Sequence, residues 1–411
     1  MSTYYLPPDP AFTQVDPIHR VSLLKPPQTT AHGLVLSLAL HNDLGTRIAR
    51  NNLTVTVGWT FREGVPPGLY VLAGSTPGTN KWSQAGVAIS QFDVSRIVVP
   101  IVQRGSASAP ALRDGWKKGR GALADVAVDP LPLASLAISV SPTPLVAVSQ
   151  LWQAGQELDW IMPLRIQFPT SLPGVDSHPV LSRPIRLARP DTPSSGNPPS
   201  SPMLWISEPS AFDHKPLGSS VWDAALVLAG HLTSSPSLVT ASTVVVELGA
   251  GCGFLGKVLT AAHPTPLRTV LTDLPNVVEP YMRANTQALC SVTCAAYCWG
   301  DPWPNDLVAE QNAGEHGEHV VVVGADITYN EALYPKLLAS LVQLRRKWPR
   351  AKVVVAFKRR SSEGEEEFLR RFDDQVVKRM NGGESGEWEM EVVARTAGQV
   401  YVMEAGLVAR H

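Results

Sequence analysis

Three glycines at alternate positions form the most distinctive local pattern of the chain, Thr243-Val-Val-Val-Glu247-Leu-Gly249-Ala-Gly251-Cys-Gly253. A valine run, a glycine-rich turn and an apolar segment in this order predict a strand, a turn and a helix. Glycine lets the backbone approach a ligand closely, and the N–H groups at the start of a helix face that ligand. A tight turn without a ligand is the alternative, but such a turn does not need three alternate glycines. We therefore expect a ligand site here.

Two acidic residues near this turn restrict the choice of ligand. Asp273 ends the next predicted strand, where a carboxylate can accept both ribose hydroxyls of an adenosine cofactor. The spacing Gly251-x-Gly253-x-x-Gly256 also satisfies the dinucleotide fingerprint, so NAD stays an alternative. Glu247 argues against NAD, because its negative charge would lie near a pyrophosphate but suits a cationic sulfonium. The residues therefore favour S-adenosyl-L-methionine as the cofactor.

Strands and helices alternate from residue 221 onwards, and these elements must position the turn and the acids. Continuous valine runs are typical of parallel strands that are buried on both faces. We expect strands at 243–247, 269–272, 295–298, 320–323 and 352–357, helices at 221–232, 253–262, 277–289, 334–348 and 365–379, and final strands at 387–394 and 399–404. This pattern predicts an α/β fold with a parallel sheet, to which the final hairpin adds an antiparallel edge.

The first two hundred residues have a different character, because 27 of the 36 prolines precede residue 221. Apolar and β-branched runs between turn signals predict strands at 53–61, 69–72, 94–99, 135–140 and 145–151. We divide the chain into a β-rich, irregular N-terminal extension or accessory domain (1–188), a Pro/Ser-rich linker or loop (189–202) and the α/β domain (203–411). The N-terminal region is expected to recruit a substrate, so that its deletion would spare cofactor binding.

Composition and charge exclude several classes of function. The formal net charge is −1, which argues against a nucleic-acid binder held by excess Lys and Arg. Residues 130–156 carry no charge and could span a bilayer, but Pro142 and Pro144 favour two short strands instead. The start of the chain lacks the pattern of a signal peptide, and four cysteines fit a reducing compartment. We expect a cytoplasmic protein, also present in the nucleus, that binds neither nucleic acid nor membrane.

Three of the cysteines, Cys290, Cys294 and Cys298, recur at every fourth residue, as ligands on one helix face would. These three soft ligands have no fourth ligand nearby, and Cys298 lies on a predicted strand instead of a helix. We therefore interpret the three cysteines as buried small residues. We expect no metal.

Six segments in a fixed order carry a family resemblance: VWDAAL (221–226), VELGAGCGFLG (246–256), LTDLP (271–275), the pair Trp299-Gly300, VGADITY (323–329) and AFKRR (356–360). Together they resemble the seven-β-strand protein-lysine methyltransferases of methyltransferase family 16, of the methyltransferase-like 21 type, which include enzymes acting on elongation factors and chaperones. The resemblance covers about residues 203–404. It implies a Rossmann-like, doubly wound, seven-stranded methyltransferase sheet. It also implies a monomer that transfers a methyl group from S-adenosylmethionine to a lysine amine of a protein substrate.

The resemblance also implies roles for individual residues. Asp273 would hold the ribose, Trp299 would stack beside the adenine, and Asp326 and Tyr329 would be the catalytic residues that shape the lysine channel. Cys298 departs from the family, which usually has an acidic residue there. The cofactor site implied as a whole consists of Trp222, Glu247, Gly249, Gly251, Gly253, Asp273, Leu274, Trp299 and Ala325.

Other functions stay open at this point. A non-catalytic interaction module could retain the fold, and a methyltransferase of this fold could act on a small molecule. DNA amino-methyltransferases typically carry an Asn/Asp-Pro-Pro-aromatic run after the fourth strand, whereas this chain has Ala325-Asp326-Ile327-Thr328-Tyr329.

Overall fold

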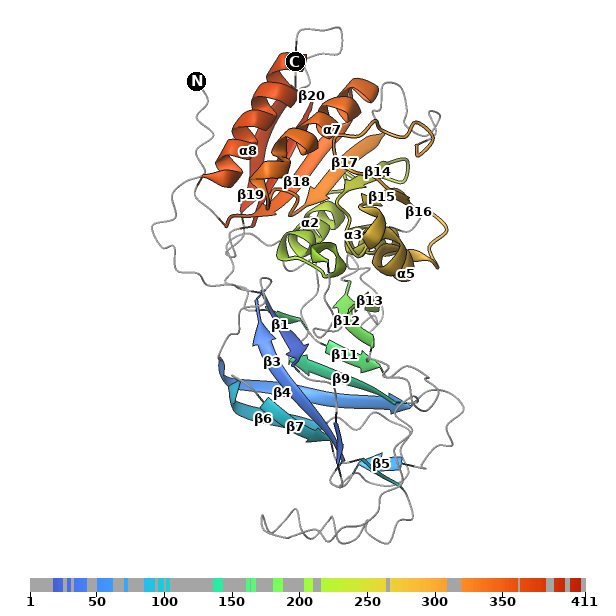
Figure 1. Ribbon diagram of the computed structural model, residues 1–411, viewed down its shortest axis with the longest axis vertical. Coiled ribbons are helices and arrows are strands. Elements are labelled where there is room, and N and C mark those ends of the chain that lie inside the picture. Colours follow the sequence, from blue (N-terminus) through green and yellow to red (C-terminus); the bar gives the residue numbers. More distant parts are fainter. Residues whose placement is uncertain are drawn as a thin grey trace, which may run out of the picture.

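The computed structural model describes most of the chain after residue 216 and separate strands before it (Figure 1). The described residues are 18–24, 28–30, 33–42, 50–61, 70–72, 85–92, 95–99, 101–103, 136–142, 160–162, 164–167, 180–187, 203–209, 216–263, 267–308, 319–360, 363–381, 388–395 and 400–407. Figure 1 shows an α/β part built from the C-terminal half of the chain and a β part built from the N-terminal half.

The α/β part contains a seven-stranded sheet in the order β16-β15-β14-β17-β18-β20-β19. The chain starts at the centre, runs outwards to one edge and then to the other, so the sheet is doubly wound. Pairing is parallel from β16 to β18 and antiparallel from β18 through β20 to β19, which confirms the predicted fold. The strands are β14 (Val244–Leu248), β15 (Arg268–Asp273), β16 (Val292–Ala296), β17 (Val320–Ala325), β18 (Lys352–Lys358), β19 (Trp388–Arg395) and β20 (Val400–Leu407).

Helices cover both faces of this sheet (Figure 1). Side chains alternate between the faces: Val244 and Val246 belong to the apolar cluster under α7 and α8, whereas Val245 belongs to the cluster under α2 and α3. The helices are α2 (Asp223–Ser234), α3 (Phe254–Ala262), α4 (Pro275–Val277), α5 (Ala284–Thr286), α7 (Tyr334–Lys347) and α8 (Gly364–Phe372), with 3₁₀ turns at Leu217–Ser219, Glu331–Leu333 and Lys378–Met380 and π-helical segments at Val278–Arg283 and Asp373–Val377.

The helix expected at 277–289 is interrupted. It consists of α4, a π-helical segment and α5, and ends at Thr286. Pro280 lies inside the π-helical segment. Proline has no N–H to donate and its ring clashes with the preceding turn, which explains why a regular α-helix does not run through this position.

Antiparallel pairing dominates the β part. Strands β1 (Ile18–Leu23), β3 (Gly33–His41) and β2 (Gln28–Thr30) follow one another in a five-stranded sheet with β10 (Trp160–Met162) and β7 (Ser95–Val99), in which only the β1–β10 pair is parallel among the described strands. A six-stranded sheet has the order β13 (Met203–Glu208), β12 (Val180–Arg186), β11 (Leu164–Gln167), β9 (Leu136–Pro142), β4 (Arg50–Phe61) and β6 (Ala85–Phe92). β5 (Tyr70–Leu72) pairs with β8 (Ile101–Gln103).

Most of the strands expected in this part coincide with observed ones: 53–61 with β4, 69–72 with β5, 94–99 with β7 and 135–140 with β9. The strand expected at 145–151 and the linker at 189–202 lie outside the described residues. Among the helices that the structure describes, none is both long and apolar enough to cross a membrane.

The two parts share an apolar core. Met162, Ile185, Leu187 and Ile206 come from the N-terminal strands or directly follow one, and each is at most 4% exposed. They belong to the same cluster as the apolar faces of α2 and α3. The N-terminal strands therefore pack directly on the helices that cover one face of the seven-stranded sheet.

Candidate active site

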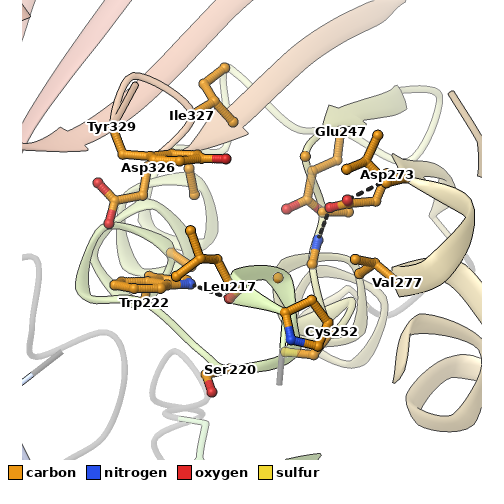
Figure 2. Close-up of a pocket in the computed structure, with 18 of the residues that line it drawn as sticks. Leu217, Ser220, Trp222, Glu247, Cys252, Asp273, Val277, Asp326, Ile327 and Tyr329 are labelled. Carbon is orange, nitrogen blue, oxygen red and sulfur yellow. Dashed lines mark hydrogen bonds between the residues drawn. The ribbon is translucent and has the colours of Figure 1, made fainter. Parts of the chain in front are cut away.

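A cavity of about 630 Å³ lies at the carboxyl ends of β14, β15 and β17 (Figure 2). The order of the sheet reverses between β14 and β17, and ligands of doubly wound folds bind at such a point. Nearly all the residues expected at the site line this cavity: Trp222, Glu247, Gly249, Gly251, Asp273, Leu274, Trp299, Ala325, Asp326 and Tyr329.

The glycine turn forms one wall of the cavity, and two of its glycines have no room for a side chain. Gly249 has a φ of 66° and Gly251 a φ of 56°, which residues with a Cβ rarely adopt. A Cβ on Gly251 would lie 2.7 Å from the carbonyl oxygen of Gly218, and one on Gly249 would lie 2.9 Å from a methyl carbon of Ile327. Backbone thus forms the cavity surface at both positions.

Gly253 has a different role from the other two. It is absent from the cavity lining and is instead the left-handed residue at which α3 begins. A Cβ at this position would lie 3.0 Å from the side chain of Thr286 and 3.4 Å from those of Leu271 and Met282. This glycine therefore shapes the entry into α3 rather than the surface of the cavity.

Asp273 holds the glycine turn through the backbone. Its Oδ2 accepts a hydrogen bond from the Gly251 N–H at 2.8 Å, and its Oδ1 accepts one from the Leu274 N–H at 2.7 Å. Burial raises the pKa of Asp273, and these two N–H donors oppose the rise. A carboxylate held in this way has acceptor lone pairs left for a ligand hydroxyl.

Glu247 is 2% exposed, and its Oε2 has no hydrogen-bond partner among the described residues. Burial raises the pKa of this carboxyl well above its ordinary value, and the charge of Asp273 raises it further. A buried oxygen without a partner is costly unless a ligand supplies a donor. Glu247 therefore favours a ligand with hydrogen-bond donors or positive charge.

Trp222 lies opposite, at the start of α2 (Figure 2). Its indole N–H donates to the Leu217 carbonyl at 3.0 Å, which ties it to the preceding 3₁₀ turn. The Arg360 guanidinium lies 5.6 Å from the centre of its ring. Trp222 thus lines the cavity through its ring and contacts a cation that the family resemblance did not imply.

Asp326 is 6% exposed and has a φ of 58°, the only positive φ among the described non-glycine residues. Arg360 binds it with both terminal nitrogens, Nη1 to Oδ1 at 2.7 Å and Nη2 to Oδ2 at 2.6 Å. The Lys358 backbone N–H adds a longer contact of 3.3 Å to Oδ1. A bidentate Arg–carboxylate pair of this kind has a defined orientation, so Asp326 is rigidly held and its charge is neutralised.

The rim of the cavity is apolar and exposed. Tyr329 is 50% exposed, Leu274 48% and Leu217 58%. Burial of part of the ring raises the pKa of Tyr329, and the charge of Asp273 adds to this. Its phenol is therefore neutral near pH 7, and Tyr329 can act as an aromatic wall and a hydrogen-bond donor.

Trp299 and Cys298 line the cavity next to each other, as their neighbouring positions predicted. Trp299 packs against the core, and its ring lies 3.2 Å from the position that a Cβ on Gly249 would take. The three periodic cysteines do not share one environment: Cys294 is buried on β16, Cys298 is half-buried and Cys290 is exposed. The expectation of three buried small residues therefore holds only for Cys294.

Sequence reasoning missed several residues of the site. Arg360 was not among the residues expected at the site, although it follows β18, the strand next to the one that precedes Asp326. Asp326 and Arg360 follow adjacent parallel strands, and such strands end at the same edge of the sheet. Their opposite charges could therefore have predicted that the two residues form a pair. Other lining residues without such a signal are Leu217, Gly218, Val277, Ile327 and Lys336.

Comparisons with known proteins agree with this arrangement. Residues 200–375 match the model of a family described as lysine methyltransferase. EEF1A lysine methyltransferase 3 of Mus musculus is 33% identical over 154 residues, which are 37% of this chain and 60% of the relative. Protein N-lysine methyltransferase METTL21A of Xenopus tropicalis is 32% identical over 140 residues, 32% of this chain and 58% of the relative. The chain thus spans about 60% of the length of these curated relatives.

A third curated relative is fungal, the protein-lysine N-methyltransferase EFM3 of Chaetomium thermophilum. It is 31% identical over 157 residues, 37% of this chain and 46% of the relative. A solved methyltransferase from Aquifex aeolicus, described as SAM-dependent, is 16% identical with a TM-score of 0.30, covering 44% of this chain and 97% of that chain. The fold assignment itself stands on the strand order given above.

The residues of the cavity fit S-adenosyl-L-methionine, the cofactor of this family. Asp273 offers carboxylate acceptors to ribose hydroxyls, and the unpartnered Oε2 of Glu247 offers one to an ammonium or another donor. The bare backbone of Gly249 and Gly251 allows a ligand to approach closely. Over residues 200–375, the chain is similar to the lysine methyltransferase family, and its curated relatives include a methyltransferase of the methyltransferase-like 21 type.

Proposed function

We propose that this protein is an S-adenosylmethionine-dependent protein-lysine N-methyltransferase. The observation that carries the proposal is the pairing of two different ends in one cavity. Glu247 and Asp273 form an end with acceptor capacity for the cofactor, while Asp326, Trp222 and Tyr329 form an end beside an apolar, exposed rim (Figure 2).

The chemistry asked of the protein is mainly positioning. When bound, the cofactor supplies a methyl group on a sulfonium, which an amine can attack directly. A lysine amine carries a proton below its free pKa of about 10.4, so it has to lose that proton first. The apolar rim and the rings of Trp222 and Tyr329 remove water from the amine, which favours its neutral form. Alignment of the nitrogen in the cavity then supplies most of the rate enhancement.

Asp326 has a positioning role in this proposal. Arg360 neutralises the carboxylate, so Asp326 offers an entering amine an oriented acceptor without a large net negative charge. A free carboxylate would stabilise the ammonium form and oppose methyl transfer. The Asp326–Arg360 pair therefore suits an acceptor that reacts as a neutral amine.

The acceptor class in this proposal is a protein, and more narrowly a factor of the translation or chaperone machinery. The name of the mouse relative specifies an EEF1A lysine, and the exposed Leu217, Leu274 and Tyr329 offer a protein surface an apolar contact. The proposal includes a monomer that acts in the cytoplasm, and also in the nucleus, without nucleic-acid or membrane partners. Four free cysteines fit such a reducing compartment.

The test is a methylation assay with the purified full chain, methyl-labelled cofactor and a lysate of matching cells. We expect label in one or a few proteins, recovered as methyl-lysine after complete hydrolysis. A parallel reaction with Gly251→Ala, which blocks the turn, should leave those proteins unlabelled.

The alternatives predict different results. Label in small molecules or nucleic acid would replace the protein-lysine assignment with another acceptor. Cofactor binding by calorimetry without any labelled product, in lysates freed of pre-existing methylation, would favour a non-catalytic module.

A further inference from the structure

A buried ion-pair chain joins the N-terminal strand β1 to the start of helix α2. Arg20 on β1 donates from Nη2 to Asp223 Oδ1 at 2.7 Å, and Lys358 donates from Nζ to Asp223 Oδ2 at 2.9 Å. The Arg20 and Lys358 side chains are 8% and 9% exposed and that of Asp223 is 1% exposed. Asp223 therefore depends on one cation from the N-terminal region and on one from β18.

The residue before Trp222 is held on both sides by the same region. Arg20 Nη2 donates to the Val221 carbonyl at 2.9 Å, and the Val221 N–H donates to Glu208 Oε1 at 2.9 Å. Glu208 ends β13 and is itself paired with Arg183 of β12 at 2.9 Å. The peptide groups that lead into Trp222 are thus fixed by side chains of three N-terminal strands.

A third set of contacts links β13 to the glycine turn through the side chain of Asn285 in α5. The Asn285 side chain accepts from the Ser207 N–H and donates to the Ser207 carbonyl, at 2.8 and 3.0 Å. It also donates to the carbonyl of Cys252, between Gly251 and Gly253, at 3.0 Å. The N-terminal strands therefore contact the wall that carries Trp222 directly, and they reach the glycine turn through Asn285 of α5.

We propose that Arg20 is a positioning residue of the cofactor cavity, so that the N-terminal strands complete the methyltransferase site instead of only recruiting a substrate; this inference rests on the proposed function. Leu217, Gly218, Val221 and Trp222 line the cavity, and Arg20 binds Val221 and Asp223, the residues on either side of Trp222. Gly218 lies beside the glycine turn, because a Cβ on Gly251 would be 2.7 Å from its carbonyl oxygen. Loss of Arg20 would leave Asp223 with Lys358 and release the Val221 carbonyl, and the wall would shift.

The consequence reverses the expectation that deletion of the N-terminal region spares cofactor binding. A wall held by buried hydrogen bonds at Val221 and Asp223 is lost together with the strands that supply the donors. Cofactor affinity, rather than substrate capture alone, should then depend on β1.

The first experiment measures binding of S-adenosylhomocysteine, the demethylated cofactor, by calorimetry to the full chain. We expect Arg20→Met to weaken binding at least tenfold. The matched control is Arg165→Met, which removes a half-buried arginine of β11 that stacks on Trp205 and is not part of the cavity lining. The control should bind within twofold of the wild type, with melting temperatures recorded for both variants.

A second measurement uses the wild type, so it does not depend on how a variant folds. By reciprocity, a ligand whose affinity depends on Arg20 must in turn stabilise β1. We expect S-adenosylhomocysteine to slow amide hydrogen exchange in residues 18–23 as well as in 216–223, and to leave β4 unchanged.

The outcomes separate this inference from the proposed function. Absence of binding to the wild type would contradict the proposed function. If the wild type binds S-adenosylhomocysteine and a folded Arg20→Met variant binds it with equal affinity, the inference is overturned. If Arg20→Met does not fold, hydrogen exchange decides: slowing in 216–223 with none in 18–23 overturns the inference.

Discussion

The two ends of the cavity treat buried acid in opposite ways. At one end, Glu247 has an oxygen without a partner among the described residues, and Asp273 accepts hydrogen bonds from the backbone N–H groups of Gly251 and Leu274. At the other end, Asp326 is bound by both terminal nitrogens of Arg360. One end therefore holds two acids that form no ion pair among the described residues, whereas the acid at the other end is paired with Arg360.

This difference has a physical meaning for a two-substrate enzyme. An uncompensated buried acid destabilises the empty protein but strengthens binding of a ligand that supplies donors or positive charge. A compensated acid has little net attraction for a cation, and it suits an acceptor that must arrive without its proton. The comparison therefore assigns the cofactor to the Glu247 end and the amine to the Asp326 end, and the following predictions test that division.

The largest effect is expected from Gly251→Ala. The new Cβ would meet the Gly218 carbonyl at 2.7 Å in a backbone with a φ of 56°, so the turn has to shift. We predict a loss of S-adenosylhomocysteine affinity of about a hundredfold or more, measured by calorimetry, since the strain and the clash together cost on the order of 2–3 kcal/mol. Gly406→Ala is the control, because its nearest neighbour is 3.5 Å away, and it should bind normally.

Asp273→Asn should weaken cofactor binding by roughly ten- to a hundredfold, the usual range for losing hydrogen bonds to a charged group. The amide cannot accept from both Gly251 and Leu274 in the way the carboxylate does. Asp326→Asn is the matched comparison: it should leave cofactor affinity within about threefold and lower turnover instead, because a neutral amide orients the amine less well. Equal losses of affinity in both variants would contradict the division of the cavity.

Arg360→Met should destabilise the folded protein by about 2 kcal/mol in urea unfolding. It leaves Asp326 buried without its partner, and the full penalty for breaking a buried pair is reduced because the Arg360 side chain is 20% exposed. The double variant Arg360→Met/Asp326→Asn should be more stable than the sum of the single effects predicts. Strict additivity would show that the pair is not coupled.

The Glu247 carboxyl should produce a measurable pH dependence of stability. Its pKa in the folded state is raised above the ordinary value near 4.5, so the folded state binds the proton more tightly than the unfolded state. Its stabilising contribution is complete below the unfolded pKa and is lost as pH rises through the folded pKa. The free energy of unfolding of the wild type, minus that of Glu247→Gln, should therefore fall as pH rises from about 4 upwards. A flat difference would show that Glu247 is not buried as an uncompensated acid.

Tyr329→Phe should have the smallest effect. Half of this side chain is exposed, so removal of its hydroxyl costs little stability. We predict a loss of turnover of about two- to fivefold, the size expected for one neutral hydrogen bond, with cofactor affinity unchanged. A larger loss would assign the phenol a direct part in holding the amine.

Local patterns in the sequence were sufficient for most of the α/β part. The alternation of apolar and amphipathic segments predicted a strand at or near each of the seven, most clearly for the valine runs of β14, β17 and β18, because a parallel strand buried on both faces requires a continuous apolar run. The strand expected at 295–298 lies three residues earlier in the structure, at β16. The exception was Pro280, where a strong helical pattern hid a residue that cannot donate in the helix. The N-terminal strands were predicted less completely, since short strands between prolines have weak periodicity. Strands β1, β3 and β12 were not predicted from the sequence.

The candidate site also contains some residues that local sequence patterns predicted and others that they did not. Gly249, Gly251 and Asp273 were predictable because a turn and the end of the neighbouring strand lie close together in any doubly wound sheet. Gly253 was assigned to the cofactor by the same reasoning, and the structure places it at the start of α3 instead. Arg360 was visible as a basic residue, but its partner Asp326 lies 34 residues away, directly after the preceding strand β17.

The sequence by itself determined where the strands of the sheet lie along the chain, the glycine turn and the acid that holds it, because each follows from the periodicity and residue types of a short segment. Only the tertiary structure decided which charges meet. Arg20 and Asp223 are separated by 203 positions, and Lys358 lies a further 135 positions from Asp223. Such pairs form because packing of the N-terminal strands on α2 removes water from all three groups, so each cation must find an acid within reach.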